Sequence, residues 1–222
     1  MAKQVWKPAT LLSPLPAALV TCGTVEEPNV LTIAWTGIIN SSPAMTYISV
    51  RPERWSHHII SESGEFVINV TTDSLVRAAD FCGVRSGKDT DKFAEMKLTA
   101  LPASKVSAPI LAQSPISLEC KVTEVKHLGS HDMFIAEIVA IQVDDKYIDA
   151  DGKLDLRKAG VMFYSHGEYF AQGKKICQMG YSVKKKNAQK TLNLQRKKKV
   201  NKQKNPRPKA GDFFIYFIFV KS

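Results

Sequence analysis

The stretch "TYISVRPERWSHHII", residues 46–60, joins an apolar run to side chains that can bind an anion. Two fixed cations, Arg51 and Arg54, lie here among the hydroxyl groups of Ser49 and Ser56. A phosphate group accepts charge-assisted hydrogen bonds from several directions, so this composition suits a phosphate. Taken alone, the stretch is equally well explained as a solvated strand end with Arg–Glu pairs on the surface.

A second basic segment, "CGVRSGKDTDKF" at residues 82–93, has the composition of an anion-binding loop. It combines two glycines, a serine and three cations, so that exposed backbone N–H groups, together with Lys88 or Lys92, could contact phosphate oxygens. The Walker order of residues is absent, and no Gly-x-Gly-x-x-Gly follows an apolar strand pattern. We therefore expect neither a P-loop nor a Rossmann dinucleotide site.

Other catalytic chemistry has no support in the sequence. The cysteines form no Cys-x-x-Cys pair, and the five histidines show no His-Glu-x-x-His spacing. We predict no metal site and no catalytic side chain, and we expect buried free thiols at Cys22, Cys82, Cys120 and Cys177.

The elements that must position these segments are mostly strands. Apolar patterns and flanking turn residues predict strands at residues 17–24, 29–40, 44–51, 65–71, 114–128 and 132–144. The first two of these strands are predicted to form one hairpin, and the last two a second, longer hairpin. Helical periodicity is limited to residues 54–63, 74–83 and 91–96. With 222 residues and 44% hydrophobic content, the chain can close one substantial core. The pattern predicts a mainly β fold, an antiparallel barrel with a few connecting helices.

The net charge of +10 is confined to one end of the chain. From Lys184 onward there are 13 Lys and Arg residues against one acid, Asp212, which leaves 18 positive and 20 negative residues in 1–183. We expect residues 184–222 to form a disordered basic extension. An alternative function, binding of RNA or anionic lipid by this extension, is less favoured because no aromatic residue interleaves its lysines.

Membrane insertion and secretion are not indicated. The apolar run "FFIYFIFV" has eight residues, whereas a helix needs about 20 to span a bilayer. The N-terminus lacks the apolar core and cleavage site of a secretory signal, so we predict a cytoplasmic location.

Several segments in order resemble the landmarks of the flavin reductase family. They are "TIAWTGIINSSPAMTYISVRPERWSHHIISESGEFVINV", "CGVRSGKDTDKF", "LGSHDMFIAEIV" and "GVMFYSHGEYF". The resemblance covers roughly residues 10–183 and is closest to the flavoredoxins. It implies a homodimer of FMN-binding split β-barrels of Greek-key type, each holding FMN without a covalent link near the subunit interface. It lies within the predicted domain, residues 1–183, and leaves out the extension.

Carried over residue by residue, the resemblance implies a set of FMN contacts. The ring and ribityl chain would meet Trp35, Thr36, Asn40, Ser41 and Ser42, with Asn29 at the ring edge. The phosphate would meet Ser49, Arg51, Ser56 and Lys92. Near the ring would lie His131 and a lid residue, Phe163. Each residue alone also fits a structural role: a core Trp, a plain Asn-Ser-Ser-Pro turn, a hairpin-turn His, and barrel residues at Phe163 and Tyr164.

The family resemblance implies an NAD(P)H-dependent flavin reductase. Hydride would pass from the nicotinamide to the flavin, and the electrons would pass on to free flavin or another acceptor. The alternative within the resemblance is an FMN electron-transfer protein of flavoredoxin type, which receives electrons from a protein partner and does not use NAD(P)H directly. Oxidation of NAD(P)H with free FMN separates the two.

Overall fold

The computed structural model describes residues 1–183; the predicted basic extension, residues 184–222, lies outside the described residues. Residues 1–173 form one compact unit, and Lys174 begins a second. The described part of the second unit contains one short 3₁₀ helix, Tyr181–Val183. The cavities and contacts that follow all belong to the first unit.

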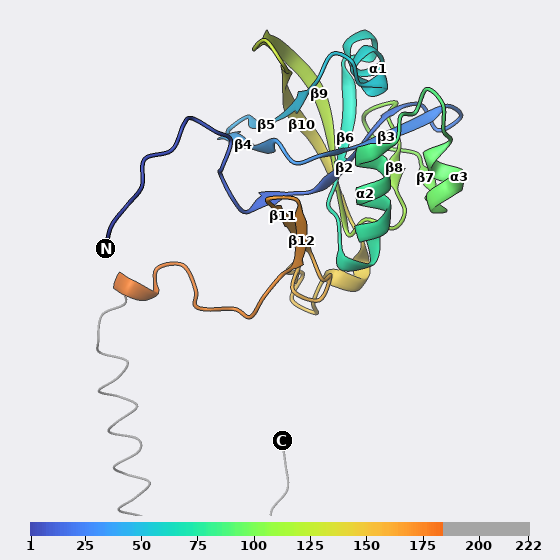
Figure 1. Cartoon of the computed structure of the whole chain (residues 1–222). Coiled ribbons are helices and arrows are strands. Elements are labelled where there is room, and N and C mark those ends of the chain that lie inside the picture. Colours follow the sequence, from blue (N-terminus) through green and yellow to red (C-terminus); the bar gives the residue numbers. More distant parts are fainter. Residues whose placement is uncertain (184–222) are drawn as a thin grey trace, which may run out of the picture. The chain divides into compact units, whose positions relative to one another are not determined.

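A seven-stranded antiparallel sheet is the main structure of the first unit (Figure 1). In spatial order its strands are β3 (Pro28–Ile33), β2 (Ala18–Gly23), β6 (Glu65–Asn69), β9 (Ile116–His127), β10 (Asp132–Val143), β5 (Ala44–Val50) and β4 (Thr36–Ser41). The hairpins β2–β3 and β9–β10 are the two that the sequence pattern predicts, and their predicted pairing is confirmed.

Strand β2 illustrates why these segments pair as they do. Successive side chains of a strand point to opposite faces. Accordingly Ala18, Val20 and Cys22 belong to the main core cluster, whereas Leu19 packs in a separate cluster on the other face. Both faces of the strand are buried, which explains its nearly continuous apolar sequence.

The sheet curls into a barrel at the corner between β3 and β4. These strands are consecutive in sequence but lie at opposite ends of the strand order. At the corner the Ser49 N–H donates to the Trp35 carbonyl at 3.0 Å, and Leu31 of β3 shares one core cluster with Ile48 of β5. The predicted single strand over residues 29–40 is therefore wrong, because the chain breaks at Ala34–Trp35 to cross from one edge of the sheet to the other.

Helices pack against the barrel where the sequence predicts them. They are α1 (Trp55–Ser63), α2 (Val76–Val84) and α3 (Lys92–Met96). Short 3₁₀ helices lie before α2, at Asp73–Leu75, and after β10, at Asp145–Tyr147. Helices α2 and α3 pack on the outer faces of β2 and β3 (Figure 1), where Leu19 and Val30 meet Cys82 and Phe93. The Asp91 carboxylate caps α3 by accepting hydrogen bonds from two backbone N–H groups, each at 3.0 Å.

Two small sheets were not predicted from the sequence. One consists of β1 (Leu15–Pro16), β11 (Met162–Ser165) and β12 (Glu168–Ala171), and the other of β7 (Ala100–Leu101) and β8 (Ile110–Leu111). Phe163 and Tyr164 lie in β11, so the prediction of barrel residues at these positions is wrong.

Cys22, Cys82 and Cys120 are buried free thiols, as predicted. Burial raises the pKa of Cys22 and Cys82 to about 11 and that of Cys120 to about 12, which makes all three unreactive at neutral pH. The prediction is wrong for Cys177, which is exposed like the other described residues that follow β12. Across residues 1–183, no helix has the length and apolar character that would let it cross a bilayer.

Candidate functional site

Three neighbouring cavities bring the predicted anion-binding segments together. We call them the corner cavity (about 160 Å³), the central cavity (about 340 Å³) and the α1 cavity (about 940 Å³). Arg51 and Arg54 line both the corner and the central cavity. Trp55, Gly87 and Lys92 line both the central and the α1 cavity. The shared residues place the three cavities next to one another.

The central cavity is strongly cationic. Pro52 follows the end of β5 and α1 begins at Trp55, so the short turn between them carries Arg51 and Arg54 to the rim. Only one acid, Glu53, lines this cavity; its carboxylate lies 3.4 Å from the exposed Arg51 guanidinium. The lining residues are Leu31, Arg51, Glu53, Arg54, Trp55, Ser56, Val84, Arg85, Ser86, Gly87 and Lys92. The predicted phosphate residues Arg51, Ser56 and Lys92 are thus brought to one cavity.

Lys92 is a buried cation with two fixed partners. Its side chain is 5% exposed, and its Nζ donates to the Val30 carbonyl at 2.6 Å and to the Cys82 carbonyl at 3.2 Å. An ammonium group has three N–H donors, so one remains for a ligand in the adjoining cavities. Burial lowers the pKa of Lys92 from its ordinary value. This residue both joins β3 to α2 and supplies charge to the cavity wall.

Asn29 and Ser56 form a buried pair beside Lys92. The Asn29 amide Nδ2 donates to the Ser56 hydroxyl at 2.6 Å, which leaves the hydroxyl proton free to donate elsewhere. A Cβ atom at Gly87 would lie 2.1 Å from Asn29 Oδ1 and 3.1 Å from the Trp55 ring. The loop that follows α2 therefore approaches so closely that this position requires glycine. The loop, β3 and α1 are held together at this point.

Two aromatic rings and a cation surround the corner cavity. Trp35 and His131 lie with ring centroids 4.5 Å apart and planes tilted by 37°, and Ser49 and Arg51 line the same cavity. His131 ends the turn between β9 and β10, where its carbonyl accepts a hydrogen bond from the Leu128 N–H at 3.0 Å. Burial, and then the charge of Arg51, lower the pKa of His131, so the ring is neutral at neutral pH. The structure thus brings four predicted residues together.

A buried carboxylate that sequence reasoning missed fixes this turn against α1. Asp132 is 6% exposed, and its two oxygens lie 2.8 Å from His57 Nε2 and 2.8 Å from His127 Nδ1. The hydrogen bond with His127, followed by that with His57, outweighs burial and lowers the pKa of Asp132. Because His131 is the preceding residue, the bridge positions its ring at the corner cavity. No signal in the sequence links an Asp to a His 75 positions away.

Other predicted contacts lie away from the three cavities. The Thr36 hydroxyl donates to the Tyr47 carbonyl at 2.5 Å, and Asn40 Nδ2 donates to the Pro43 carbonyl at 2.9 Å. Ser41 and Ser42 are exposed near the tip of the β4–β5 hairpin. The remaining predicted contact, Phe163, stacks on Phe170 in the small sheet with centroids 5.4 Å apart and planes at 15°. None of these residues lines the corner, central or α1 cavity.

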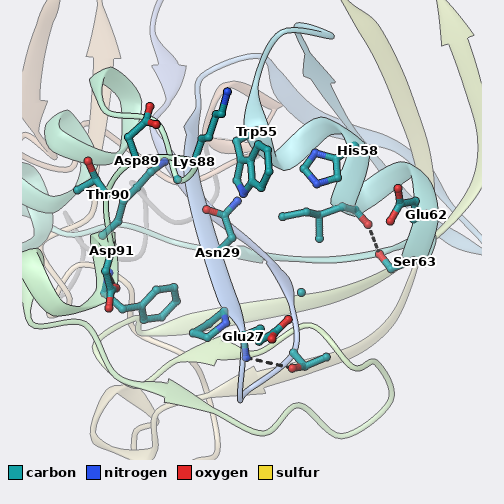
Figure 2. Close-up of a pocket in the computed structure, with 17 residues that line it drawn as sticks. Glu27, Asn29, Trp55, His58, Glu62, Ser63, Lys88, Asp89, Thr90 and Asp91 are labelled. Atoms are coloured by element: carbon teal, nitrogen blue, oxygen red, sulfur yellow. Dashed lines mark hydrogen bonds between the residues drawn. The ribbon is translucent and has the colours of Figure 1, made fainter.

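The α1 cavity and its aromatic wall are additions to the predicted site. The cavity lies between α1 on one side and the loop carrying Lys88 to Asp91 on the other, with Asn29 and Trp55 between them (Figure 2). The basic composition of residues 82–93 indicated the loop, but nothing in the sequence marks Trp55 as a cavity residue. Arg54 lies near Arg51 in the anion-binding stretch of the sequence, but it was not among the predicted FMN contacts.

Comparisons with known proteins agree with this architecture. The family model described as "Flavin reductase like domain" matches residues 11–171. The solved structure of flavoredoxin of Desulfovibrio vulgaris (Miyazaki F) is similar with a TM-score of 0.76 and 31% identity, covering 82% of this chain and 100% of that one. Flavoredoxin from Methanosarcina acetivorans has a TM-score of 0.75 at 23% identity, again covering 82% and 100%. An uncharacterized protein of Archaeoglobus fulgidus is 32% identical over 170 residues, which is 77% of this chain and 94% of that one.

Proposed function

Because the chain belongs to the family of the flavin reductase like domain, with the split β-barrel fold of its structural neighbours, we propose that it is an FMN-binding oxidoreductase. It accepts hydride from NAD(P)H and passes electrons to free flavin or another acceptor. The observation that carries the proposal is the pairing of the cationic central cavity with a corner cavity walled by aromatic rings.

The donor set of the central cavity fits the phosphate of FMN. Arg51, Arg54 and Lys92 offset a dianionic group, and the free protons of Lys92 and Ser56 can donate to its oxygens. Buried cations without an anion are unfavourable, so a phosphate here would also supply a counter-charge that offsets the desolvation of Lys92. Ser49, at the border of the corner cavity, adds a further hydroxyl.

The corner cavity fits the other end of the same molecule. Trp35 is 38% exposed, so its indole presents an apolar surface against which an isoalloxazine can pack, and His131 lies beside it. Arg51 and Arg54 line both cavities, so a ligand with its phosphate in the central cavity reaches the corner cavity directly.

The protein's contribution to the reaction is binding and orientation. When bound, FMN supplies the hydride-accepting and electron-carrying chemistry, which is why no catalytic side chain is required. Arg51 places a fixed positive charge between the two cavities, where it stabilises negative charge on either side. His131 stays neutral and offers a hydrogen bond without adding charge. Asp132 holds that ring in place through its two histidine partners.

We also propose that the chain forms a homodimer through the edge strand β4. Ile38 and Ile39 are 68% and 48% exposed on this edge strand, a surface that monomeric proteins usually protect. Thr36 and the segment Asn40 to Ser42 belong to the same strand and turn. In a dimer formed through this strand, these residues would contact the flavin bound to the second copy. Light scattering after size exclusion tests this: Ile38→Lys should convert a dimer to a monomer, and a monomeric parent protein would refute it.

The second candidate function is electron transfer without direct use of NAD(P)H. It is favoured by the likeness to flavoredoxin of Desulfovibrio vulgaris at 31% identity. Steady-state oxidation of NADH and of NADPH in the presence of free FMN separates the two: turnover supports the reductase, and reduction by dithionite alone supports the carrier. A cytoplasmic location and a chain that does not bind nucleic acid remain predictions.

A further inference from the structure

The α1 cavity lies outside the proposed FMN site. It measures about 940 Å³ and is lined by α1, by the turn between β2 and β3 and by the loop that follows α2. The close contact of Gly87 with Asn29 and Trp55 forms the wall between this cavity and the cationic central cavity. Ligand pockets in proteins range over about 300–1,000 Å³, so the α1 cavity can hold a small molecule of its own.

Helix α1 gives the cavity an aromatic wall that ends in an acid. Four of its residues share one helix face and line the cavity: Trp55, His58, Ile59 and Glu62. Trp55 is 40% exposed, and the His58 ring packs edge-on against it with centroids 4.4 Å apart and planes at 71°. An α-helix rises about 1.5 Å per residue, so Glu62 lies about 10 Å along the helix from Trp55.

Carboxylates lie on both sides of the indole. Figure 2 shows Asp89 on the loop to one side of Trp55 and Glu62 on α1 to the other. Glu27, from the turn between β2 and β3, also lines the cavity. All three acids are exposed, and within the described residues 1–183 none of them forms an ion pair.

The cavity lining as a whole carries an excess of negative charge. It has four acids and two cations, which leaves two negative charges: Glu27, Glu62, Asp89 and Asp91 against Lys88 and Lys92. The Lys92 ammonium donates to the Val30 and Cys82 carbonyls, and Lys88 forms no ion pair with any described residue. The charge of the lining therefore disfavours an anionic ligand and favours a cationic one.

A buried hydrogen-bond acceptor faces the same cavity. Asn29 is 8% exposed; its Nδ2 donates to Ser56 and Cys22, but its Oδ1 accepts no hydrogen bond from the part of the chain that the structure describes. Asn29 lines the α1 cavity and not the central one, and Figure 2 shows its oxygen directed toward the loop that carries Lys88. Buried polar atoms normally have a partner, so this oxygen indicates a ligand that donates hydrogen bonds.

These observations define a ligand that is positively charged, donates hydrogen bonds and has an apolar body. We propose that the α1 cavity binds a polyamine, a linear aliphatic amine with a charged group at each end, at a site separate from the flavin. The alkyl chain packs on the Trp55 indole, whose ring face also attracts ammonium groups, and the charged ends meet Glu62 and Asp89. Because two negative charges are in excess and lie on both sides of the indole, an elongated dication fits better than a single ammonium.

The test is calorimetry on the full chain, with 1,8-diaminooctane and spermidine as probes. We expect both to bind, and 1,8-octanediol, which has the same carbon chain and no charge, to show no binding. Glu62→Gln, Glu27→Gln and Asp89→Asn should each weaken diamine binding about three- to fivefold, as expected for exposed ion pairs. Glu26→Gln is the matched control, because Glu26 is an exposed neighbour of Glu27 that does not line the cavity. All four positions are exposed, so the variants should fold.

A second readout locates the bound amine. The chain has three tryptophans, and the indole N–H signal of Trp55 can be assigned in a proton–nitrogen NMR spectrum by its loss in Trp55→Phe. Addition of 1,8-diaminooctane should shift the Trp55 signal and leave that of Trp35, in the corner cavity, in place. A shift of the Trp35 signal alone would place the amine elsewhere and overturn the assignment to the α1 cavity.

The remaining outcomes are equally decisive. Equal binding of the diamine and the diol, or diamine binding that none of the three acid substitutions weakens, would overturn the polyamine site. Binding of tetralysine that Glu62→Gln weakens, with no binding of 1,8-diaminooctane or spermidine, would assign the cavity to a basic polypeptide and also overturn it. These readouts do not involve flavin, so their failure leaves the FMN site standing, and failure of the chain to bind flavin leaves this inference standing.

Discussion

Arg51→Ala is the substitution that separates phosphate binding from folding most cleanly. Arg51 lines the central and corner cavities from the turn that follows β5, and 53% of its side chain is exposed. Its one ion pair in the described chain is with Glu53 at 3.4 Å. Exposed pairs of this kind contribute about 0–1 kcal/mol to stability, so the variant should fold normally.

The expected effect on binding follows from the charge of the phosphate. Loss of a hydrogen bond between a guanidinium and a phosphate costs about 1.5–3 kcal/mol, which is about 10- to 150-fold in the dissociation constant of FMN. Riboflavin lacks the phosphate, so its affinity should change by no more than about threefold. The ratio of the two dissociation constants cancels any general loosening of the cavity.

The assay is flavin fluorescence quenching with FMN and riboflavin on the parent protein, Arg51→Ala and Glu53→Ala. Glu53→Ala removes the same ion pair and keeps the cation, so it should not weaken FMN binding, and the loss of the nearby negative charge favours the phosphate. Equal losses for FMN and riboflavin in Arg51→Ala would mean that Arg51 is structural and would refute the phosphate site.

Three further substitutions test the scaffold. Gly87→Ala places a Cβ 2.1 Å from Asn29 Oδ1, and we expect the melting temperature to fall by about 3–10 °C in a circular-dichroism melt; an unchanged midpoint would contradict the close approach. Lys92→Met leaves two backbone carbonyls without their donor, so urea unfolding should show a loss of about 1–3 kcal/mol. The same variant should bind FMN much more weakly, while full stability with full affinity would refute both roles. Asp132 has a pKa held below its ordinary value of 3.8, chiefly by the hydrogen bond with His127, so its contribution to stability is present above about pH 4 and is lost as the pH falls through the lower, folded-state value. Asp132→Asn should therefore lose stability at pH 7 and flatten the acid side of the stability profile, and an unaltered profile would contradict the bridge.

Strands with a long, self-contained pattern were predictable from the sequence. The apolar run of β2 and the turn residues between β2 and β3 are local signals, and the structure has that hairpin where they indicate. The small sheet was not predictable, because β1 has two residues and pairs Leu15 with Tyr164. A two-residue strand carries no period, and its partner is far away in the sequence. The corner at Trp35 was missed because both strands that it joins are apolar.

The residues of the candidate site were also only partly predictable from the sequence. Composition alone indicated the anion-binding segments, and the structure brings Arg51, Ser56 and Lys92 to one cavity. The carboxylate bridge at Asp132 depends on side chains from three separate elements, and a single sequence gives no sign of it. The Trp55 wall was missed because exposure of an aromatic residue is decided by the packing around it, here by a glycine.

The visible absorption spectrum of the purified protein tests the central claim most directly. The protein would be incubated with excess FMN, desalted, and its bound flavin measured against its polypeptide concentration. We predict a yellow protein that retains about one flavin per chain. The Arg51→Ala variant should lose its flavin on desalting. A colourless protein after desalting, together with unquenched fluorescence of added FMN and FAD, would contradict the flavin site and leave the central and corner cavities without their proposed ligand.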